Sequence, residues 1–219
     1  MSEKKKEIAI SIVEDDVKFR STLARLIDST EGFCCVSQHP DAENALKELP
    51  VSRPEVVLMD INMPGMSGVE CVRPLKKLLP SVQIVMLTVY DDADLIFKAL
   101  SAGATGYLLK QSTPDQIVHA IRNVHAGGSP MTSQIARKVV ASFQKQIAGM
   151  ANYQKLTKRE QEVLGQLARG STYSEIAETL KISYDTVRAH IRNIYEKLHV
   201  QSATQAVSLH LQFTDKGGN

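Results

Sequence analysis

Short apolar runs alternate with longer segments of helical periodicity over the first 126 residues, and this alternation constrains the fold more than any other feature. The apolar runs are rich in Val, Ile and Leu and predict strands at 8–13, 34–39, 56–60, 84–88 and 106–110. Between them, apolar residues recur at spacings of three and four, which predicts amphipathic helices. Strands that alternate with helices in this way indicate a doubly wound parallel sheet.

Local signals mark both ends of the last of these helices and conflict with another. Thr113 and Gln116 form a capping-box pattern with Pro114 between them, and Gly127 follows the same helix. Pro74 conflicts with the helix predicted after Gly68, and we expect it to kink that helix or to shift its start.

Two of the predicted strands end in acidic residues. The run before Asp60 stops at that single aspartate and is followed by a Pro-Gly turn, while the run 8–13 stops at Glu14-Asp15-Asp16. The carboxyl ends of parallel strands meet at one edge of a sheet, so these carboxylates should converge there. Like charges that close require a cation or a proton. The pattern therefore predicts a divalent metal site or strongly raised pKa values.

Charge is unevenly distributed along the chain, although the net charge is only +2. Residues 1–126 carry 14 basic and 17 acidic side chains, residues 127–152 carry 3 basic and none acidic, and residues 153–219 carry 9 and 7. The parts are therefore expected to have different tasks. No apolar stretch has the length of a membrane span and no signal-peptide pattern is found, so we expect a cytoplasmic location and no membrane partner.

Three cysteines, Cys34, Cys35 and Cys71, lack a C-x-x-C spacing, which argues against a disulfide framework and against a thiolate metal site. The run Gly127-Gly128-Ser129-Pro130 ends the first domain. We expect residues 127–152 to form a linker with an amphipathic helix and a flexible joint at 148–152. The apolar face of that helix is Ile135, Val139, Val140, Phe143 and Ile147.

Residues 153–219 predict an all-helical domain of four short helices. Capping-box patterns occur at Thr157/Glu160, Thr172/Glu175 and Ser202/Gln205. Only Lys181-Ile182-Ser183 separates the second and third helices, which is the length of a helix-turn-helix corner. The third helix, 184–198, carries Arg188 and Arg192 one turn apart on its polar face, with the small Ala189 between them.

Together these motifs resemble those of a known family. Residues 8–126 resemble a response-regulator receiver domain and residues 153–213 resemble a LuxR-type helix-turn-helix, the pairing of the NarL/FixJ family of two-component transcription regulators. The motifs are Glu14-Asp15-Asp16, Asp60 with Met63-Pro64-Gly65 and Gly68, Thr88, Gly106-Tyr107 leading to Lys110, Leu156 to Glu160, Glu175-Ile176-Ala177, and Thr186 to His190. All of them occur in order and at the family's spacing.

The resemblance implies a fold and a domain plan. The first domain is expected to be a flavodoxin-like five-stranded parallel sheet of order 2-1-3-4-5, followed by an all-α helix-turn-helix domain. The expected boundaries are receiver 1–126, linker 127–152 and DNA-binding domain 153–219.

The resemblance also implies a chemistry, that of a regulator and not of an enzyme. Asp60 would accept a phosphoryl group from a histidine of a partner sensor kinase. Mg²⁺ would be held by Asp16, Asp60 and the backbone carbonyl of Asn62, with Asp15 acting through water. Lys110 and Thr88 would contact the phosphoryl oxygens, and Tyr107 would move with Thr88 as a switch that promotes dimerisation.

For double-stranded DNA, the expected base contacts are Arg188, Ala189 and Arg192. The expected phosphate contacts are Lys158, Arg159, Lys181 and Lys197. Because the second domain has a net charge of only +2, we expect a homodimer on paired half-sites. The family often has Asn, Lys, Gly and Arg where this chain has Tyr173, Ser174, His199 and Ala203, so some backbone contacts would be missing.

Other interpretations stay open at this stage. Asp15 could cap a helix, Tyr107 could be an ordinary core aromatic, and the two arginines of 184–198 could be a solvated face. His190 is expected to pack or to contact phosphate because no second metal ligand stands at i+4. Two other functions compete: a phosphohydrolase, which would need a second aspartate where Asn62 stands, and a DNA-binding regulator that is independent of phosphorylation.

Overall fold

A five-stranded parallel sheet forms the centre of the first part of the chain. The computed structural model describes residues 7–214, apart from the side chains of Lys145, Gln146 and Gln212. The strands are β1 (Ile8–Val13), β2 (Phe33–His39), β3 (Val56–Met59), β4 (Gln83–Thr88) and β5 (Gly106–Leu109), in the order β2-β1-β3-β4-β5. The sequence prediction of the sheet and its order is confirmed, with strand ends shifted by a residue at most.

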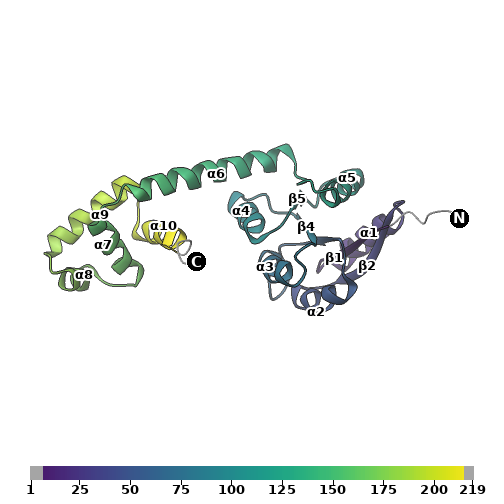
Figure 1. Cartoon of the computed structure of the whole chain (residues 1–219), viewed down its shortest axis with the longest axis horizontal. Helices are drawn as coiled ribbons and strands as arrows, with labels where there is room; N and C mark the ends of the chain where they lie inside the picture. Colours follow the sequence, from purple (N-terminus) through teal and green to yellow (C-terminus); the bar gives the residue numbers. More distant parts are fainter. Residues whose placement is uncertain (1–6, 215–219) are drawn as a thin grey trace. The chain divides into compact units, whose positions relative to one another are not determined.

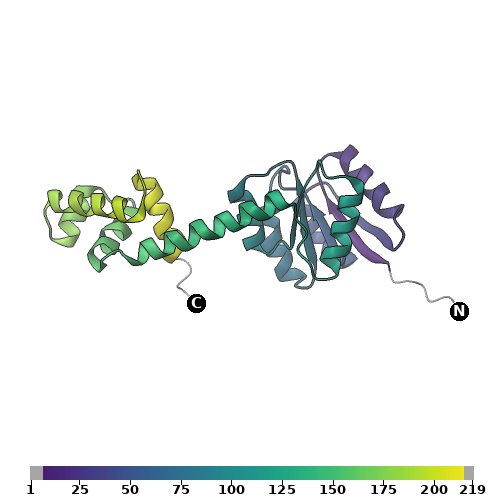
Figure 2. The ribbon, with the colours of Figure 1, turned by 90° about the horizontal axis from the view of Figure 1, so that it is seen from above.

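Helices cover both faces of this sheet (Figures 1 and 2). They are α1 (Val17–Asp28), α2 (Ala42–Ser52), α3 (Gly68–Leu78), α4 (Ala93–Ala102) and α5 (Pro114–His125). One core joins α2, α3 and α4 to the sheet, and a second joins α1 and α5 to its other face. Because both faces are covered, all four residues of β3 and all four of β5 are buried.

The local helix signals are partly confirmed. The capping box of Thr113 and Gln116 starts α5 as predicted. Pro74 lies inside α3, which nevertheless starts at Gly68 behind a capping box of Ser67 and Glu70. The shifted start predicted for Pro74 is therefore not found.

The segment after α5 adds to the edge of the sheet. The backbone N–H of Tyr107 donates to the carbonyl of Pro130 at 2.9 Å, and the Ser129 hydroxyl donates to the carbonyl of Thr105 at 2.7 Å. A Cβ atom on Gly106 would lie 2.8 Å from the Pro130 side chain, so the close approach needs glycine there. The start of the linker thereby covers the β5 edge.

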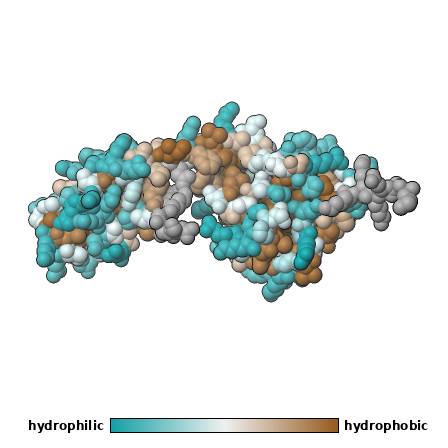
Figure 3. Space-filling model, in the orientation of Figure 1, coloured by the Kyte–Doolittle hydropathy of each residue, from teal (hydrophilic) through white to brown (hydrophobic). Residues whose placement is uncertain are grey.

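The long helix α6 (Ser133–Gln154) follows, and its two ends belong to different units of the chain. The chain forms two compact units, residues 1–142 and 143–219, so the division falls within α6. Ile135 is fully buried in the core between the sheet and α2 to α4, whereas Val140, Phe143 and Ile147 are 55%, 52% and 69% exposed. Brown, hydrophobic surface accordingly lies along α6 in Figure 3.

The flexible joint predicted at 148–152 is wrong, because α6 continues as helix through these residues. Ala148, Met150 and Ala151 favour a helix, and a single glycine costs only about 1 kcal/mol. Gly149 faces the Phe213 ring, and a Cβ atom there would make an ordinary van der Waals contact at 3.5 Å.

The second unit contains four short helices after α6, as predicted. They are α7 (Lys158–Ala168), α8 (Tyr173–Leu180), α9 (Tyr184–Leu198) and α10 (Ala203–Thr214), and they share one apolar core. The capping boxes that start α7 and α8 are both present. At α10 only half of the predicted box forms: Gln205 N–H donates to Ser202 Oγ, but the Gln205 side chain accepts from Gln201.

Within residues 7–214, no helix is both long enough and apolar enough to cross a membrane.

Candidate functional site

Asp60 lies at the carboxyl end of β3, in the loop that leads to α3. Its backbone N–H donates to the carbonyl of Val13 at 2.9 Å, which holds it beside the end of β1. Its side chain is buried, and Oδ1 accepts from the N–H of Ile61 at 2.6 Å. The loop packs so closely that a Cβ atom on Gly68 would lie 1.8 Å from the Asp60 carbonyl oxygen. Gly68 is therefore required by close approach and not by an unusual backbone angle.

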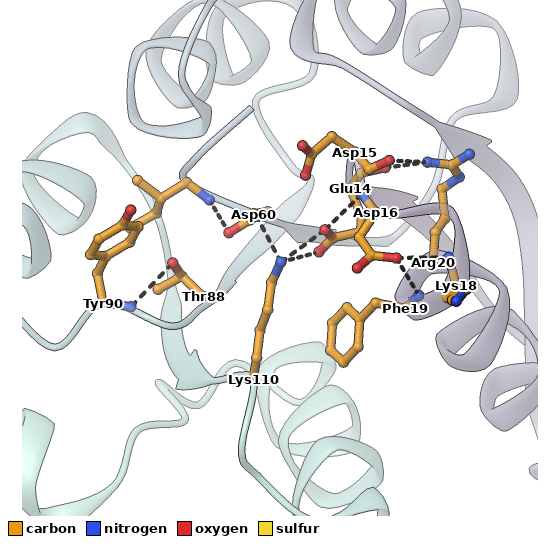
Figure 4. Close-up of polar contacts among 11 residues, drawn as sticks. Glu14, Asp15, Asp16, Lys18, Phe19, Arg20, Asp60, Thr88, Tyr90 and Lys110 are labelled. Carbon is orange, nitrogen blue, oxygen red and sulfur yellow. Dashed lines mark hydrogen bonds and ion pairs between the residues drawn. The ribbon is translucent and has the colours of Figure 1, made fainter. Parts of the chain in front are cut away.

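Lys110 joins Asp60 to Glu14 (Figure 4). Its Nζ lies 2.8 Å from Asp60 Oδ2 and 2.7 Å from Glu14 Oε2. Glu14 is only 1% exposed; burial raises the pKa of its carboxyl and the charge of Asp60 adds to this, while Lys110 opposes both. Burial alone would lower the pKa of Lys110, but hydrogen bonds to Asp60 and Glu14 outweigh it and the pKa is raised. Lys110 therefore stays charged and compensates two buried carboxylates.

Three carboxylates form a candidate cation site. Oxygen atoms of Glu14, Asp15 and Asp60 lie within 4.8 Å of one another. Hard divalent cations such as Mg²⁺ prefer this kind of ligand, and the partly exposed side of the cluster leaves room for water. Asn62, which was expected to offer its carbonyl, lies two residues after Asp60 in the same loop and is exposed between the buried residues Ile61 and Met63.

Asp16 is not part of this cluster, contrary to the sequence prediction. It is the N-cap of α1, and its Oδ1 accepts from the N–H groups of Lys18 at 2.8 Å and Phe19 at 3.1 Å. These hydrogen bonds lower the pKa of Asp16. The helix-cap alternative considered for Asp15 thus applies to its neighbour. The position of Asp16 directly before a helical pattern was the sequence signal for this role.

Arg20 is a contributor that the sequence prediction missed, and Glu14 was expected at this edge of the sheet without a role of its own. The Arg20 guanidinium donates to the backbone carbonyls of Glu14 and Asp15, the latter at 3.3 Å (Figure 4). Arg20 therefore fixes the β1–α1 loop from the second turn of α1. Glu14 was visible in the sequence as the first acid after a buried strand.

Thr88 and Tyr107 lie on the two neighbouring strands. Thr88 ends β4, is fully buried, and its Oγ1 accepts from the N–H of Tyr90 at 3.4 Å. Tyr107 is also fully buried, and its hydroxyl donates to the carbonyl of Tyr90 at 2.8 Å. Burial raises the pKa of Tyr107, and Asp91, Asp92 and Asp60 add to the shift. Both side chains are therefore bonded to the loop that follows Thr88.

This loop also contacts the linker helix. Lys138 of α6 forms an ion pair with Asp91 at 2.6 Å and bonds to its backbone carbonyl. Gln134, one turn earlier, donates to Asp91 Oδ2 at 3.2 Å.

On the second unit, the predicted DNA contacts fall into two groups. Arg188, Ala189 and Arg192 are exposed on α9, and Lys158 and Lys181 are exposed at the starts and ends of their helices. Among the residues that the structure describes, no acidic side chain pairs with either arginine.

Arg159 and Lys197 are instead bonded within the domain. Arg159 pairs with Glu162 at 2.7 Å and donates to the carbonyl of Leu180. Lys197 pairs with Glu160 at 2.7 Å, and that glutamate is 3% exposed. Both basic residues therefore stabilise the helix-turn-helix, which limits what they can offer to phosphates.

The fold and this site define a class of protein: a two-component response regulator. Residues 10–122 match the family model of the response regulator receiver domain, and residues 154–210 match that of bacterial regulatory proteins of the luxR family. The chain belongs to the family of response regulators that combine these two domains, the NarL/LuxR family.

Its relatives are transcriptional regulators. It is similar to transcriptional regulatory protein LnrK of Bacillus subtilis, 38% identical over 207 residues that cover 91% of this chain and 94% of LnrK. It is also similar to nitrate/nitrite response regulator protein NarP of Escherichia coli, 36% identical, covering 93% and 94% of the two chains. The chain is therefore a regulator and not an enzyme, which sets the phosphohydrolase alternative aside.

Solved structures of response regulators have a similar fold. Response regulator ChrA of a heme-sensing two-component system matches with a TM-score of 0.53 at 28% identity, covering 95% of this chain and 98% of ChrA. RcsB from Salmonella enterica serovar Typhimurium, solved bound to promoter rprA, matches with a TM-score of 0.60, covering 93% and 98%. Its identity is 22%, so this second likeness concerns the fold alone.

Proposed function

We propose that this chain is a phosphorylation-controlled transcription regulator in which Asp60 accepts the phosphoryl group. The observation that supports this best is the buried Asp60 carboxylate held 2.8 Å from Lys110 Nζ, next to two further carboxylates. An Asp60 oxygen would form the new bond to phosphorus while the phosphorus–nitrogen bond to the kinase histidine breaks. The product is an acyl phosphate on Asp60 and a free imidazole on the kinase.

The donor set fits Mg²⁺. Asp15, Asp60 and the carbonyl of Asn62 would hold the ion, and Glu14 would lie beside these ligands. Asp16 would not be a ligand, because it caps α1. Bound Mg²⁺ would neutralise the repulsion between the carboxylate and the incoming phosphoryl group.

The chain's own residues would then stabilise the product. Lys110 can exchange Asp60 for a phosphoryl oxygen, and the Thr88 hydroxyl can donate to another. A phosphohydrolase would need a second aspartate two residues after Asp60 as its general acid. This chain has Asn62 at that position. The phosphoryl group can therefore last as a signal.

The loop after Thr88 would transmit the effect of phosphorylation to the rest of the chain. A shift of Thr88 toward the phosphoryl group changes the loop to which the Tyr107 hydroxyl and the Asp91 contacts of α6 are bonded. We assign residues 1–126 to the receiver, 127–152 to the linker and 153–219 to DNA binding, with the start of α6 packed on the receiver. A homodimer on paired half-sites is the expected active form, because one weakly basic module has little affinity by itself.

Phosphorylation can be tested by mass spectrometry of the whole chain treated with acetyl phosphate and Mg²⁺. We expect one added phosphoryl mass in the wild type and none in Asp60→Ala. Asp16→Ala is the matched control, and it should still be modified because Asp16 lies outside the carboxylate cluster. A folded wild type without added mass would contradict the proposal.

DNA recognition can be tested with duplexes enriched from a random pool. Arg188→Ala should weaken binding to the enriched duplex by about 1–3 kcal/mol and relax its sequence preference, whereas Lys158→Ala should weaken all duplexes alike. Equal losses on random DNA in both variants would argue against base contacts by Arg188. If Asp60→Ala binds as tightly as the phosphorylated wild type, the regulator acts independently of phosphorylation.

A further inference from the structure

Tyr184 is the first residue of α9, and its side chain is 48% exposed. The turn that carries it is well defined: Ser183 is the N-cap, and its hydroxyl accepts from the N–H of Thr186 at 3.1 Å. Tyrosine combines an apolar ring with a polar hydroxyl and is enriched at interfaces, so a half-exposed tyrosine at the start of this helix is a candidate contact residue.

The ring of Tyr184 is supported from one side. It lies against the ring of Tyr173, the first residue of α8, with centroids 6.2 Å apart and planes inclined by 50°. Tyr173 packs in turn against the apolar core of the second unit. A ring held in this way loses little conformational entropy when it meets a ligand.

Tyr184 shares a side of α9 with the proposed base-reading arginine. Residues four apart on a helix lie one above the other, so Tyr184 and Arg188 are neighbours, and Arg192 continues the row. All three side chains are exposed, whereas Val187 and Ile191 face the core. The exposed row therefore begins with an aromatic ring and continues with two guanidinium groups.

The chemistry of such a ring in the major groove is specific. The N-terminal residues of a recognition helix are the ones that reach base edges. Thymine alone presents a methyl group there, and apolar side-chain surface distinguishes it from the other bases. Arginine instead pairs with guanine.

We propose that Tyr184 is a specificity-determining residue that contacts the methyl group of a thymine in the major groove, next to the base read by Arg188. This inference rests on the proposed DNA recognition by α9. It assigns to the chain a preference for thymine that the arginines do not provide.

The test uses the full chain, untreated and treated with acetyl phosphate and Mg²⁺. A duplex is first enriched from a random pool with the wild type, and each thymine in it is then replaced by deoxyuridine, which removes only the methyl group. We expect one thymine in each half-site whose replacement weakens wild-type binding roughly fourfold, the order expected for one buried methyl group. Tyr184→Ala should show the same loss on the unmodified duplex and no further loss on the deoxyuridine duplex.

Two variants serve as controls. Tyr184→Phe keeps the ring and should remain sensitive to deoxyuridine, and Arg188→Ala should remain sensitive at the same thymine while losing its guanine preference. Circular dichroism establishes that each variant is folded.

The outcomes separate the inference from the function on which it rests. If Tyr184→Ala stays as sensitive to every replacement as the wild type, the inference is overturned. It is also overturned if Tyr184→Ala weakens enriched and random DNA equally, since that result indicates a backbone contact. A pool in which the wild type enriches no sequence contradicts the proposed DNA recognition itself, and the inference with it.

Discussion

At the scale of single residues, three consecutive acids have three different environments. Glu14 is buried against Lys110, Asp15 is exposed within the carboxylate cluster, and Asp16 caps α1. Successive side chains of an extended chain point to opposite sides, and the start of a helix then turns the chain away. Adjacent positions with the same charge therefore differ in function.

His39 shows how burial of one residue links stability to pH. It ends β2 and is 1% exposed, with Nε2 2.9 Å from Ser37 Oγ and Nδ1 3.5 Å from Glu48. Burial lowers the pKa of His39, although the charges of Glu48 and Asp41 oppose the shift. The unfolded chain therefore takes up the proton at a higher pH than the folded chain. The stabilisation is complete above about pH 6.5, and it is lost as pH falls below that value and through the lowered pKa of the folded chain.

We expect His39→Gln to reduce this pH dependence. In urea unfolding, the free energy of unfolding of the wild type should fall between pH 7.5 and pH 5.5 by more than that of His39→Gln. His119→Gln, on an exposed position of α5, is the matched control and should keep the wild-type slope. The same slope in His39→Gln as in the wild type would show that His39 contributes nothing to it.

At the scale of elements, α6 carries two different surfaces. Its start is built into the receiver through Ile135, with Val139 packed against the same core, and through the Lys138–Asp91 ion pair. Farther along, its apolar side chains are exposed. The sequence correctly predicted that an amphipathic helix is present. The residues of its predicted apolar face, however, do not all pack into one core.

A pair of isoleucines tests this division. Ile135→Ala should lower the free energy of unfolding of the receiver by about 2–4 kcal/mol, because it empties a fully buried site. Ile147→Ala, at a position that is 69% exposed on the same helix, should change it by less than about 0.5 kcal/mol. Urea unfolding measures both, and a loss for Ile135→Ala as small as that for Ile147→Ala would mean that the start of α6 does not stabilise the receiver.

The end of α9 explains one departure from the family pattern. His199 is the C-cap of α9 with φ of 54°, in the left-handed region that favours glycine. The family often has glycine there, and this chain adopts the same backbone conformation with a histidine.

At the scale of the whole molecule, the chain combines two units with separate cores. The carboxylate cluster lies entirely in the first, and the exposed arginines of α9 lie in the second. A ligand of the cluster should therefore stabilise one unit and leave the other unchanged.

Scanning calorimetry with and without Mg²⁺ tests this expectation. Mg²⁺ at about 100 times its dissociation constant should stabilise the receiver by about 2.7 kcal/mol and raise the temperature of its transition, while the transition of the second unit stays unchanged. Asp15→Asn should reduce the effect. A shift of both transitions by the same amount would argue against a site confined to the receiver.

Much of this architecture could be predicted from residues alone. Buried parallel strands have continuous apolar runs, and the runs at β1, β3, β4 and β5 were located to within a residue. The capping boxes of α5, α7 and α8 could also be predicted from the sequence, because a capping box involves residues only three apart. Asp60 stood out for the same local reason, as a lone carboxylate at the end of an apolar strand.

Contacts between distant residues were decided by the tertiary structure. Only the packing of β1, β3 and β5 brings Glu14, Asp60 and Lys110 together, across up to 96 residues of chain. Only packing turns Lys197 toward Glu160 and buries Ile135 while leaving Ile147 exposed. The sequence by itself determined the elements and the position of Asp60, since these depend on local periodicity and capping. The partners of each charge depend on long-range packing, which local patterns do not contain.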